Sequence, residues 1–159
     1  MRPAPSDPPE KWETGTQSFE SIAGVTAAVN YLAALGGEST HRRQALETSY
    51  SRIQAHEAQL ARLFVEGLSA LSAVRLHGVQ EYDGQRVSTF AVEVEGIHPM
   101  EVAKALRAQG VYVVSGHYYA LNAMDRLGMG DSGGLVRIGF VHYNTESEVE
   151  RTLDLLGTL

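Results

Sequence analysis

Apolar residues recur at helical spacing through residues 40–71, which predicts one long amphipathic helix. Thr40 suits the N-cap of this helix, and the slot near Glu57 is polar. The apolar stripe consists of Leu46, Tyr50, Ile53, Leu60, Phe64, Leu68 and Leu71. An earlier helical pattern, from about Ser18 to Gly36, is rich enough in apolar residues to predict a buried helix. Two long helices ahead of the first strand exclude an all-β fold.

Stretches with the composition of β-strands follow, and they exclude an all-α fold. They cover residues 74–79, 87–94, 111–115 and 135–141, and the first two are expected to pair through a turn at Asp83-Gly84. Helices are predicted from Pro99 to Gln109, from Ala120 to Leu127, and after the capping-box sequence Thr145-Glu146-Ser147-Glu148. This order of elements predicts an α+β fold: a small mixed sheet with helices packed on it and one long helix.

The first residues of the chain differ in composition from the rest. Residues 1–11 are expected to be a proline-rich linker, because Met1 to Pro9 holds four of the five prolines and almost no large apolar residue. Residues 12–159 are expected to form a single domain, since a chain of 159 residues with 43% hydrophobic content suits one core. A linker at this position suggests a domain boundary, as though a longer protein had been cut there.

The overall composition excludes several classes of function. A net charge of −6 without a cluster of Lys and Arg argues against a nucleic-acid partner. No apolar run approaches the roughly 18 residues of a membrane span. The absence of cysteine excludes disulfides, thiolate zinc sites and thiol nucleophiles; it fits a reducing compartment, and we expect a cytoplasmic protein. The six histidines form no H-E-x-x-H pattern, so no metal site is expected.

The glycine-rich run Gly130-Asp131-Ser132-Gly133-Gly134 matches serine-nucleophile signatures, including the G-x-S-x-G elbow. The elbow needs a strand before the serine and a helix after it, and the order expected here is the reverse. A trypsin-like enzyme is an all-β double barrel, which the helical first part of the chain rules out. We therefore interpret the run as a turn that tolerates positive φ, and a small hydrolase using Ser132 is the least favoured function.

Three longer motifs carry a family resemblance. In order along the chain they are WETGTQSFESIAGVTAAVNYLAALGG, SGHYYA and GGLVRIGFVHYNTESEVERTLDLL. They resemble the C-terminal portion of class V aminotransferases, and most closely the cysteine desulfurase-like branch. The resemblance extends over essentially the whole chain but only over the last part of such an enzyme. It implies the C-terminal small domain of a fold-type I enzyme that depends on pyridoxal phosphate (PLP) and forms a homodimer.

The resemblance implies roles for particular residues. In this family the E-x-G-T turn reaches the PLP of the neighbouring subunit, which implies cofactor contacts for Glu13, Gly15 and Thr16, the last two nearest the phosphate. A backbone amide and a hydroxyl suit a phosphate. The arginine of V-R-x-x-F/L-x-x-Y-N-T binds the substrate carboxylate, and here it is Arg137, whose planar fork fits a carboxylate bidentately. A surface salt bridge is the alternative for Arg137.

The segment SGHYYA departs from the family pattern. Desulfurases place the cysteine that forms the persulfide where Tyr119 stands, and Val114 replaces the preceding arginine of that loop. His117 and Tyr119 remain candidates for facing the substrate, with a structural histidine and a packed tyrosine as the alternative. No residue of this chain is expected to be catalytic by itself.

The large domain of such an enzyme, which holds the Schiff-base lysine, is missing from this sequence. The leading hypothesis is therefore a domain that contributes to a PLP site for a small amino-acid-like substrate and is inactive alone. The alternative is a free-standing binding or dimerisation module that has lost the cofactor domain. Lys11 and Lys104 are the only lysines and should be solvated, so no covalent PLP adduct of this chain is expected. An exposed apolar surface is expected along the first helix or the N-terminal half of the long one.

Overall fold

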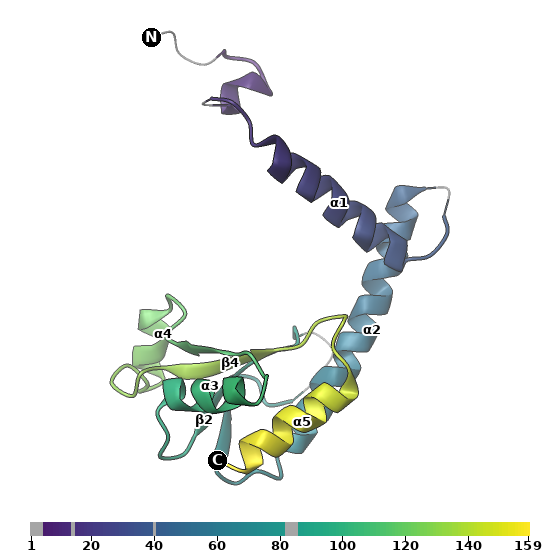
Figure 1. The fold of residues 1–159 in the computed structure, drawn as a ribbon. Coiled ribbons are helices and arrows are strands. Elements are labelled where there is room, and N and C mark those ends of the chain that lie inside the picture. Colours follow the sequence, from purple (N-terminus) through teal and green to yellow (C-terminus); the bar gives the residue numbers. More distant parts are fainter. Residues whose placement is uncertain (1–4, 14, 40, 82–85) are drawn as a thin grey trace. The chain divides into compact units, whose positions relative to one another are not determined.

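The computed structural model describes residues 5–13, 15–39, 41–81 and 86–159, so the predicted Thr40 N-cap and Asp83-Gly84 turn lie outside it. The chain divides into two compact units, Met1–Arg52 and Ile53–Leu159, and each is described by itself. A single domain over residues 12–159 stays a prediction. Figure 1 labels the five α-helices together with strands β2 and β4. The elements are η1 (Glu10–Trp12), α1 (Phe19–Leu35), α2 (Arg42–Leu68), β1 (Val74–His77), β2 (Thr89–Val94), α3 (Pro99–Ala108), β3 (Val114–Gly116), α4 (Leu121–Arg126), β4 (Leu135–Gly139) and α5 (Glu146–Gly157).

In the first unit, α1 begins and ends where the sequence predicts. The Ser18 side chain caps it by accepting a hydrogen bond from the Ser21 backbone N–H at 3.4 Å, and Gly36 follows its last residue. The C-terminal end of α1 lies against the first part of α2, where the Arg52 guanidinium donates to the Leu35 carbonyl at 2.9 Å. A Cβ at Gly36 would clash with the Ala45 carbonyl oxygen, so glycine permits this close approach.

The prediction that α1 is a buried helix is wrong, because no residue of α1 is buried. Phe19, Ile22 and Val25 are 68%, 49% and 65% exposed. Helical periodicity identifies apolar positions but does not provide a surface that covers them. The apolar surface expected along the first helix is therefore present.

The second unit is built on a four-stranded sheet in the order β1-β2-β4-β3. The α+β class is confirmed, but the sheet is antiparallel throughout rather than mixed. Strands β2 and β3 do run in the same direction and are linked through α3. However, β4 lies between them and pairs antiparallel with both, so the helical crossover creates no parallel pair.

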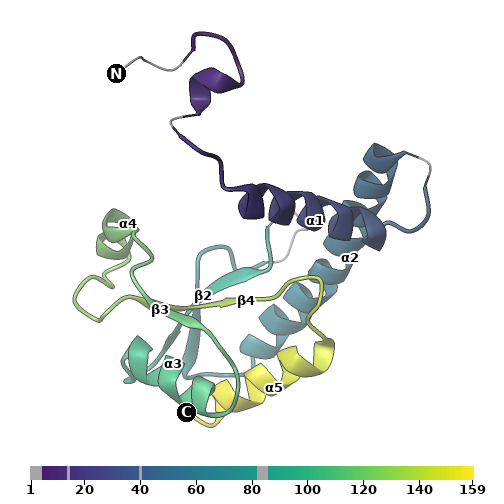
Figure 2. The ribbon, with the colours of Figure 1, turned by 45° about the horizontal axis from the view of Figure 1, so that its top comes forward.

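One face of this sheet carries the core of the second unit. Figure 2 shows α3 and α5 on the same side of the sheet. The Phe64 ring of α2 lies 4.8 Å from the Phe90 ring and 5.1 Å from the Phe140 ring, measured between centroids. The core consists of Leu60, Ala61, Phe64, Leu68, Val74, Leu76, Phe90, Val92, Val94, Val102, Leu106, Val136, Ile138, Phe140, Val149, Leu153 and Leu156.

Helix α5 confirms the predicted capping box. The Thr145 side chain accepts from the Glu148 backbone N–H at 3.3 Å, and the Glu148 carboxylate accepts from the Thr145 backbone N–H at 2.8 Å. Both hydrogen bonds occupy groups that a helix start otherwise leaves without partners. Within the described residues, no helix is long and apolar enough to cross a membrane.

Candidate functional site

Arg137 lies in the middle of β4 and faces away from the core. Val136 and Ile138 on either side are buried, whereas Arg137 is exposed, as the alternation of a strand requires. Its partners across the two neighbouring strands are Ala91 on β2 and Val114 on β3, and both are uncharged. The strand thus presents the arginine on the face of the sheet opposite the core.

No carboxylate from the described ranges forms an ion pair with Arg137. Glu93 is the acidic residue that β2 places on the same face, opposite Leu135 by continuation of the strand register. Its carboxylate lies 2.9 Å from Nε2 of His77 instead. Because Glu93 is engaged in this way, the positive charge of Arg137 has no partner within the described part of the sheet.

Tyr118 contacts the guanidinium of Arg137, and the sequence-based reading missed this residue. The Arg137 Cζ lies 5.4 Å from the centroid of the Tyr118 ring, within the range of a cation–π interaction. The Tyr118 hydroxyl donates a hydrogen bond to the carbonyl of Leu135. Burial raises the pKa of the Tyr118 phenol to about 12, although the nearby Arg137 charge acts in the opposite direction. The only signal in the sequence was its position inside SGHYYA.

The predicted residues His117 and Tyr119 flank Tyr118 in a tight loop. Tyr118 and Tyr119 have φ of 50° and 59°, a left-handed conformation that costs side-chain-bearing residues about 1–2 kcal/mol each. The His117 Nδ1 accepts a hydrogen bond from the Tyr119 backbone N–H at 3.1 Å, and the two rings lie 6.0 Å apart. Tyr119 is 99% exposed, so the packed-tyrosine alternative is wrong for this chain.

The glycine-rich run before β4 supports this loop. A Cβ on Gly134 would clash with the Gly116 carbonyl oxygen, and Gly134 has a φ of +87°. A Cβ on Gly133 would clash with the ring of His98, which caps α3 through its Nδ1. The Ser132 hydroxyl donates to the Met129 carbonyl at 3.1 Å. These contacts agree with the interpretation of the run as a turn rather than a nucleophile elbow.

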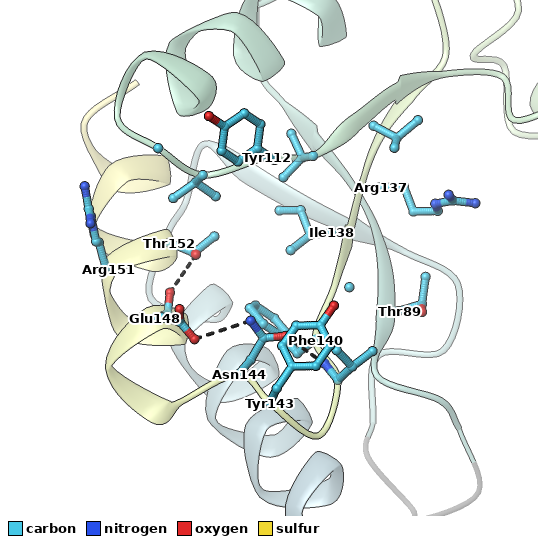
Figure 3. Close-up of a pocket in the computed structure, with 16 residues that line it drawn as sticks. Thr89, Tyr112, Arg137, Ile138, Phe140, Tyr143, Asn144, Glu148, Arg151 and Thr152 are labelled. Carbon is cyan, nitrogen blue, oxygen red and sulfur yellow. Dashed lines mark hydrogen bonds between the residues drawn. The ribbon is translucent and has the colours of Figure 1, made fainter. Parts of the chain in front are cut away.

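A hollow of about 650 Å³ lies between β4, the residues before β3, and α5 (Figure 3). The Asn144 amide donates to the Glu148 carboxylate at 3.3 Å, and the Thr152 hydroxyl donates to the Glu148 carbonyl at 2.7 Å. In Figure 3 the Arg137 side chain points away from Ile138 and the residues of α5. Arg137 therefore borders the hollow, while its guanidinium is directed to the opposite face of the strand.

The residues predicted to contact the cofactor lie in the other unit. Glu13 is partly buried, and its carboxylate accepts a hydrogen bond from the Gln17 side chain. Thr16 is exposed, and a Cβ on Gly15 would meet no atom within 4 Å. The structure thus brings together Arg137 with Tyr118, and His117 with Tyr119. Glu13, Gly15 and Thr16 lie in the first unit, which is described by itself.

The two lysines are both at the surface. Lys11 lies 4.6 Å from the centroid of the Trp12 ring, and Lys104 pairs with Glu101 at 2.7 Å. The Lys104 side chain is 63% exposed, and Lys11 is also exposed. Among the described residues, no three His, Asp or Glu side chains gather in a way that could hold a metal ion.

Comparison with known proteins identifies the family. The model of the family described as aminotransferase class-V matches residues 4–152 of this chain. The chain therefore belongs to the class-V aminotransferase family. Membership implies PLP as the cofactor of the complete enzyme.

Relatives within the family are described as cysteine desulfurases. A probable cysteine desulfurase of Mycolicibacterium paratuberculosis is 34% identical over 90% of this chain and 18% of its own length. One from Pyrococcus abyssi is 30% identical over 97% of this chain and 34% of its own length. The apo structure of a cysteine desulfurase from Thermococcus onnurineus NA1 has a TM-score of 0.75 and 29% identity, covering 96% of this chain and 34% of that one. The chain thus spans between 18% and 34% of the length of these three relatives.

Proposed function

We propose that this chain corresponds to the C-terminal small domain of a cysteine desulfurase-like PLP enzyme, in which Arg137 binds the carboxylate of a small amino-acid substrate. The observation that supports the proposal is the environment of Arg137. It is exposed on strand β4 between two paired strands, its cross-strand neighbours are uncharged, and no described carboxylate pairs with it. A guanidinium held in this way can offer two parallel N–H groups to an incoming carboxylate.

The cofactor contacts belong to the same proposal. PLP, when bound in the complete enzyme, supplies an electron sink for chemistry next to the amino group of the substrate. The open backbone at Gly15 and the exposed hydroxyl of Thr16 are donors that fit a phosphate, and Glu13 lies beside them in the chain. Neither lysine fits a Schiff-base role, because both are exposed, whereas a Schiff-base lysine is held in a desolvated site. The isolated chain is therefore proposed to be inactive.

The sequence limits the reaction that this chain can assist. It contains no cysteine, and Tyr119 stands where the resemblance implies a persulfide-forming thiol. A tyrosine hydroxyl cannot take sulfur in a persulfide bond. We therefore propose an amino-acid substrate without a sulfur-carrying step on this chain. The cytoplasmic location expected from the sequence stays a prediction.

A homodimer or a dimerisation module is the second candidate function. The observation that favours it is the exposed apolar surface of α1, with Phe19 and Val25 both about two-thirds exposed at 68% and 65%. Apolar surface of this kind marks contact sites in soluble proteins. Sedimentation velocity of the chain and of Val25→Glu tests it: concentration-dependent association that the charge abolishes supports the module.

The assignment of Arg137 is tested in a complete enzyme that contains this chain. We expect Arg137→Ala to weaken binding of L-cysteine or L-alanine by about 1.5–3 kcal/mol, because a charge-assisted contact is lost. Arg137→Lys should restore little of it, since an ammonium cannot bind bidentately. The matched control is Arg75→Ala, an exposed arginine on β1. Substrate titration followed by the cofactor absorbance gives the affinities, and equal values for Arg137→Ala and the unmodified enzyme would reject the assignment.

A further inference from the structure

An exposed arginine side chain has several rotatable bonds and loses their freedom when it binds a ligand. A carboxylate site therefore gains from any contact that holds the guanidinium in place beforehand. Within the described residues, the contact found on Arg137 is the ring of Tyr118, whose centroid lies 5.4 Å from the Arg137 Cζ.

Tyr118 is itself held at both ends. Its hydroxyl donates to the carbonyl of Leu135, two residues before Arg137 on the same strand. Its backbone follows Gly116, whose carbonyl oxygen approaches Gly134 so closely that no Cβ fits there. The backbone that leads into the loop therefore fixes the ring beside β4, and the hydroxyl adds one hydrogen bond to that strand.

Solvent exposure, rather than backbone conformation, distinguishes the two neighbouring tyrosines. Both have positive φ, yet Tyr118 is partly buried while Tyr119 is 99% exposed. Two consecutive side-chain-bearing residues in this region are unusual and are generally kept by surrounding contacts. Here the turn contains hydrogen bonds from the Tyr119 N–H to His117 Nδ1 and from the Ala120 N–H to the His117 carbonyl. The Tyr118 ring and hydroxyl add contacts to Arg137 and Leu135.

The chemistry of the phenol suits a partner for a cation that must stay available. Burial raises the pKa of Tyr118 to about 12, so the phenol is neutral at physiological pH. A neutral ring attracts the guanidinium through its π-face without cancelling the positive charge. A carboxylate in the same place would form an ion pair and compete with the substrate.

We propose that Tyr118 is a positioning residue that holds the Arg137 guanidinium over its ring, ready for a carboxylate. The proposal rests on the proposed function of Arg137 and deepens it by naming the residue that orients the binding group. A positioning residue acts through Arg137, so the effect of Tyr118 should appear in carboxylate affinity and should require an aromatic ring rather than a hydroxyl.

The first experiment measures the position of the guanidinium directly. In a ¹H–¹⁵N NMR spectrum of the arginine Nε–Hε groups of the purified chain, a ring beneath Arg137 shifts its Hε resonance upfield. Arg137→Gln assigns the signal by removing it. We expect the upfield shift in the unmodified chain and in Tyr118→Phe, and its loss in Tyr118→Leu. An Arg137 signal at the ordinary frequency in the unmodified chain would overturn the proposal, whatever the variants do.

A second arginine–tyrosine pair provides the matched control. Arg107 lies over the ring of Tyr112 with a Cζ-to-centroid distance of 5.8 Å, in the same unit of the chain. Tyr112→Leu should change the Arg107 signal and leave that of Arg137 in place. If Tyr112→Leu moved the Arg137 signal as much as Tyr118→Leu does, the specific role of Tyr118 would be rejected.

The second experiment adds a carboxylate, with sodium acetate as the probe and sodium chloride as the ionic-strength control. We expect the Arg137 signal to respond to acetate, with an affinity about threefold to tenfold weaker in Tyr118→Leu and nearly unchanged in Tyr118→Phe. Equal affinities in Tyr118→Leu and the unmodified chain would overturn the positioning role and leave the proposed function intact. An upfield signal that depends on Tyr118 but ignores acetate would instead reject the proposed function.

Discussion

Helices α1 and α5 show how differently two apolar helical patterns are used in this chain. Helix α5 buries Val149, Leu153 and Leu156 against the core of the second unit. Helix α1 in the first unit has the more apolar sequence, FESIAGVTAAVNYLAAL, and yet buries no residue. The comparison teaches that apolar content predicts a helix which needs a partner surface, whereas burial depends on whether the fold supplies that surface.

The largest expected contrast between the two units comes from removing one apolar side chain in each. Phe64→Ala should destabilise the second unit by about 3–5 kcal/mol, because Phe64 is fully buried between Phe90 and Phe140. Val25→Ala in α1 should change stability by no more than about 0.5 kcal/mol, since Val25 is 65% exposed. Urea unfolding followed by circular dichroism measures both. Similar losses for the two variants would show that α1 is covered in solution.

The second prediction compares two glycines of the first unit. Gly36 has an ordinary φ of −74°, but a Cβ there would clash with the Ala45 carbonyl oxygen. Gly36→Ala should therefore weaken the contact between α1 and the start of α2 by about 1–3 kcal/mol. Gly24 lies inside α1 with no atom within 4 Å of a Cβ, so Gly24→Ala should stabilise the helix by about 0.5–1 kcal/mol.

Hydrogen exchange of the α1 amides distinguishes these two substitutions. Exchange should become faster near Leu35 in Gly36→Ala and slower along the helix in Gly24→Ala. If Gly36→Ala also slowed exchange, the close approach between Gly36 and Ala45 would not exist in solution.

The third prediction compares the caps of the two helices. Thr145→Ala removes the acceptor of the Glu148 N–H and should cost the second unit about 1 kcal/mol. Ser18→Ala removes the corresponding acceptor of the Ser21 N–H in α1. Because no residue of α1 is buried, loss of the Ser18 cap should make amide exchange faster in the first turn of α1. It should leave the urea midpoint of the second unit unchanged. A shared shift of that midpoint would indicate that α1 contributes to the core.

The smallest effect concerns pH. The Thr145 backbone N–H and then the Asn144 side chain hold the pKa of Glu148 below its usual value. A carboxyl whose pKa is lower in the folded state than in the unfolded state stabilises the fold. This contribution is fully present at pH values above the unfolded-state pKa and is lost as the pH falls through the folded-state pKa. Unfolding free energies of the unmodified chain and Glu148→Gln should therefore converge as the pH falls below the ordinary range of a glutamate pKa. If the difference in unfolding free energy between the two proteins did not change with pH, the Glu148 carboxylate would not stabilise the cap through its charge.

In the long helix α2, the sequence pattern predicted some of the buried residues and missed others. Its predicted apolar stripe is correct where Leu60, Phe64 and Leu68 are buried in the core. The same stripe is wrong at Tyr50, which is 55% exposed, while Ala45 and Ser49 are the buried residues of that part of the helix. The pattern did not identify Ser49, because a buried serine has no apolar signal.

The candidate site also has features that the sequence predicted and features that it did not. In the sequence pattern of residues 135–141, Val136, Ile138 and Phe140 recur at alternate positions, so Arg137 is expected on the other face. The structure confirms that orientation. The contact with Tyr118 could not be predicted, because it requires a left-handed turn at Tyr118 and Tyr119 that residues with side chains rarely adopt. The roles of Glu13, Gly15, Thr16 and His117 stay predictions.

The sequence by itself determined the class of fold, the ends of α1, the capping box of α5 and the side of β4 on which Arg137 lies, because each depends on neighbours within a few residues. Only the tertiary structure decided that β4 lies between β2 and β3, that no residue of α1 is buried, and that Tyr118 lies against Arg137. These features depend on which distant segments approach each other, and local periodicity contains no information about that choice.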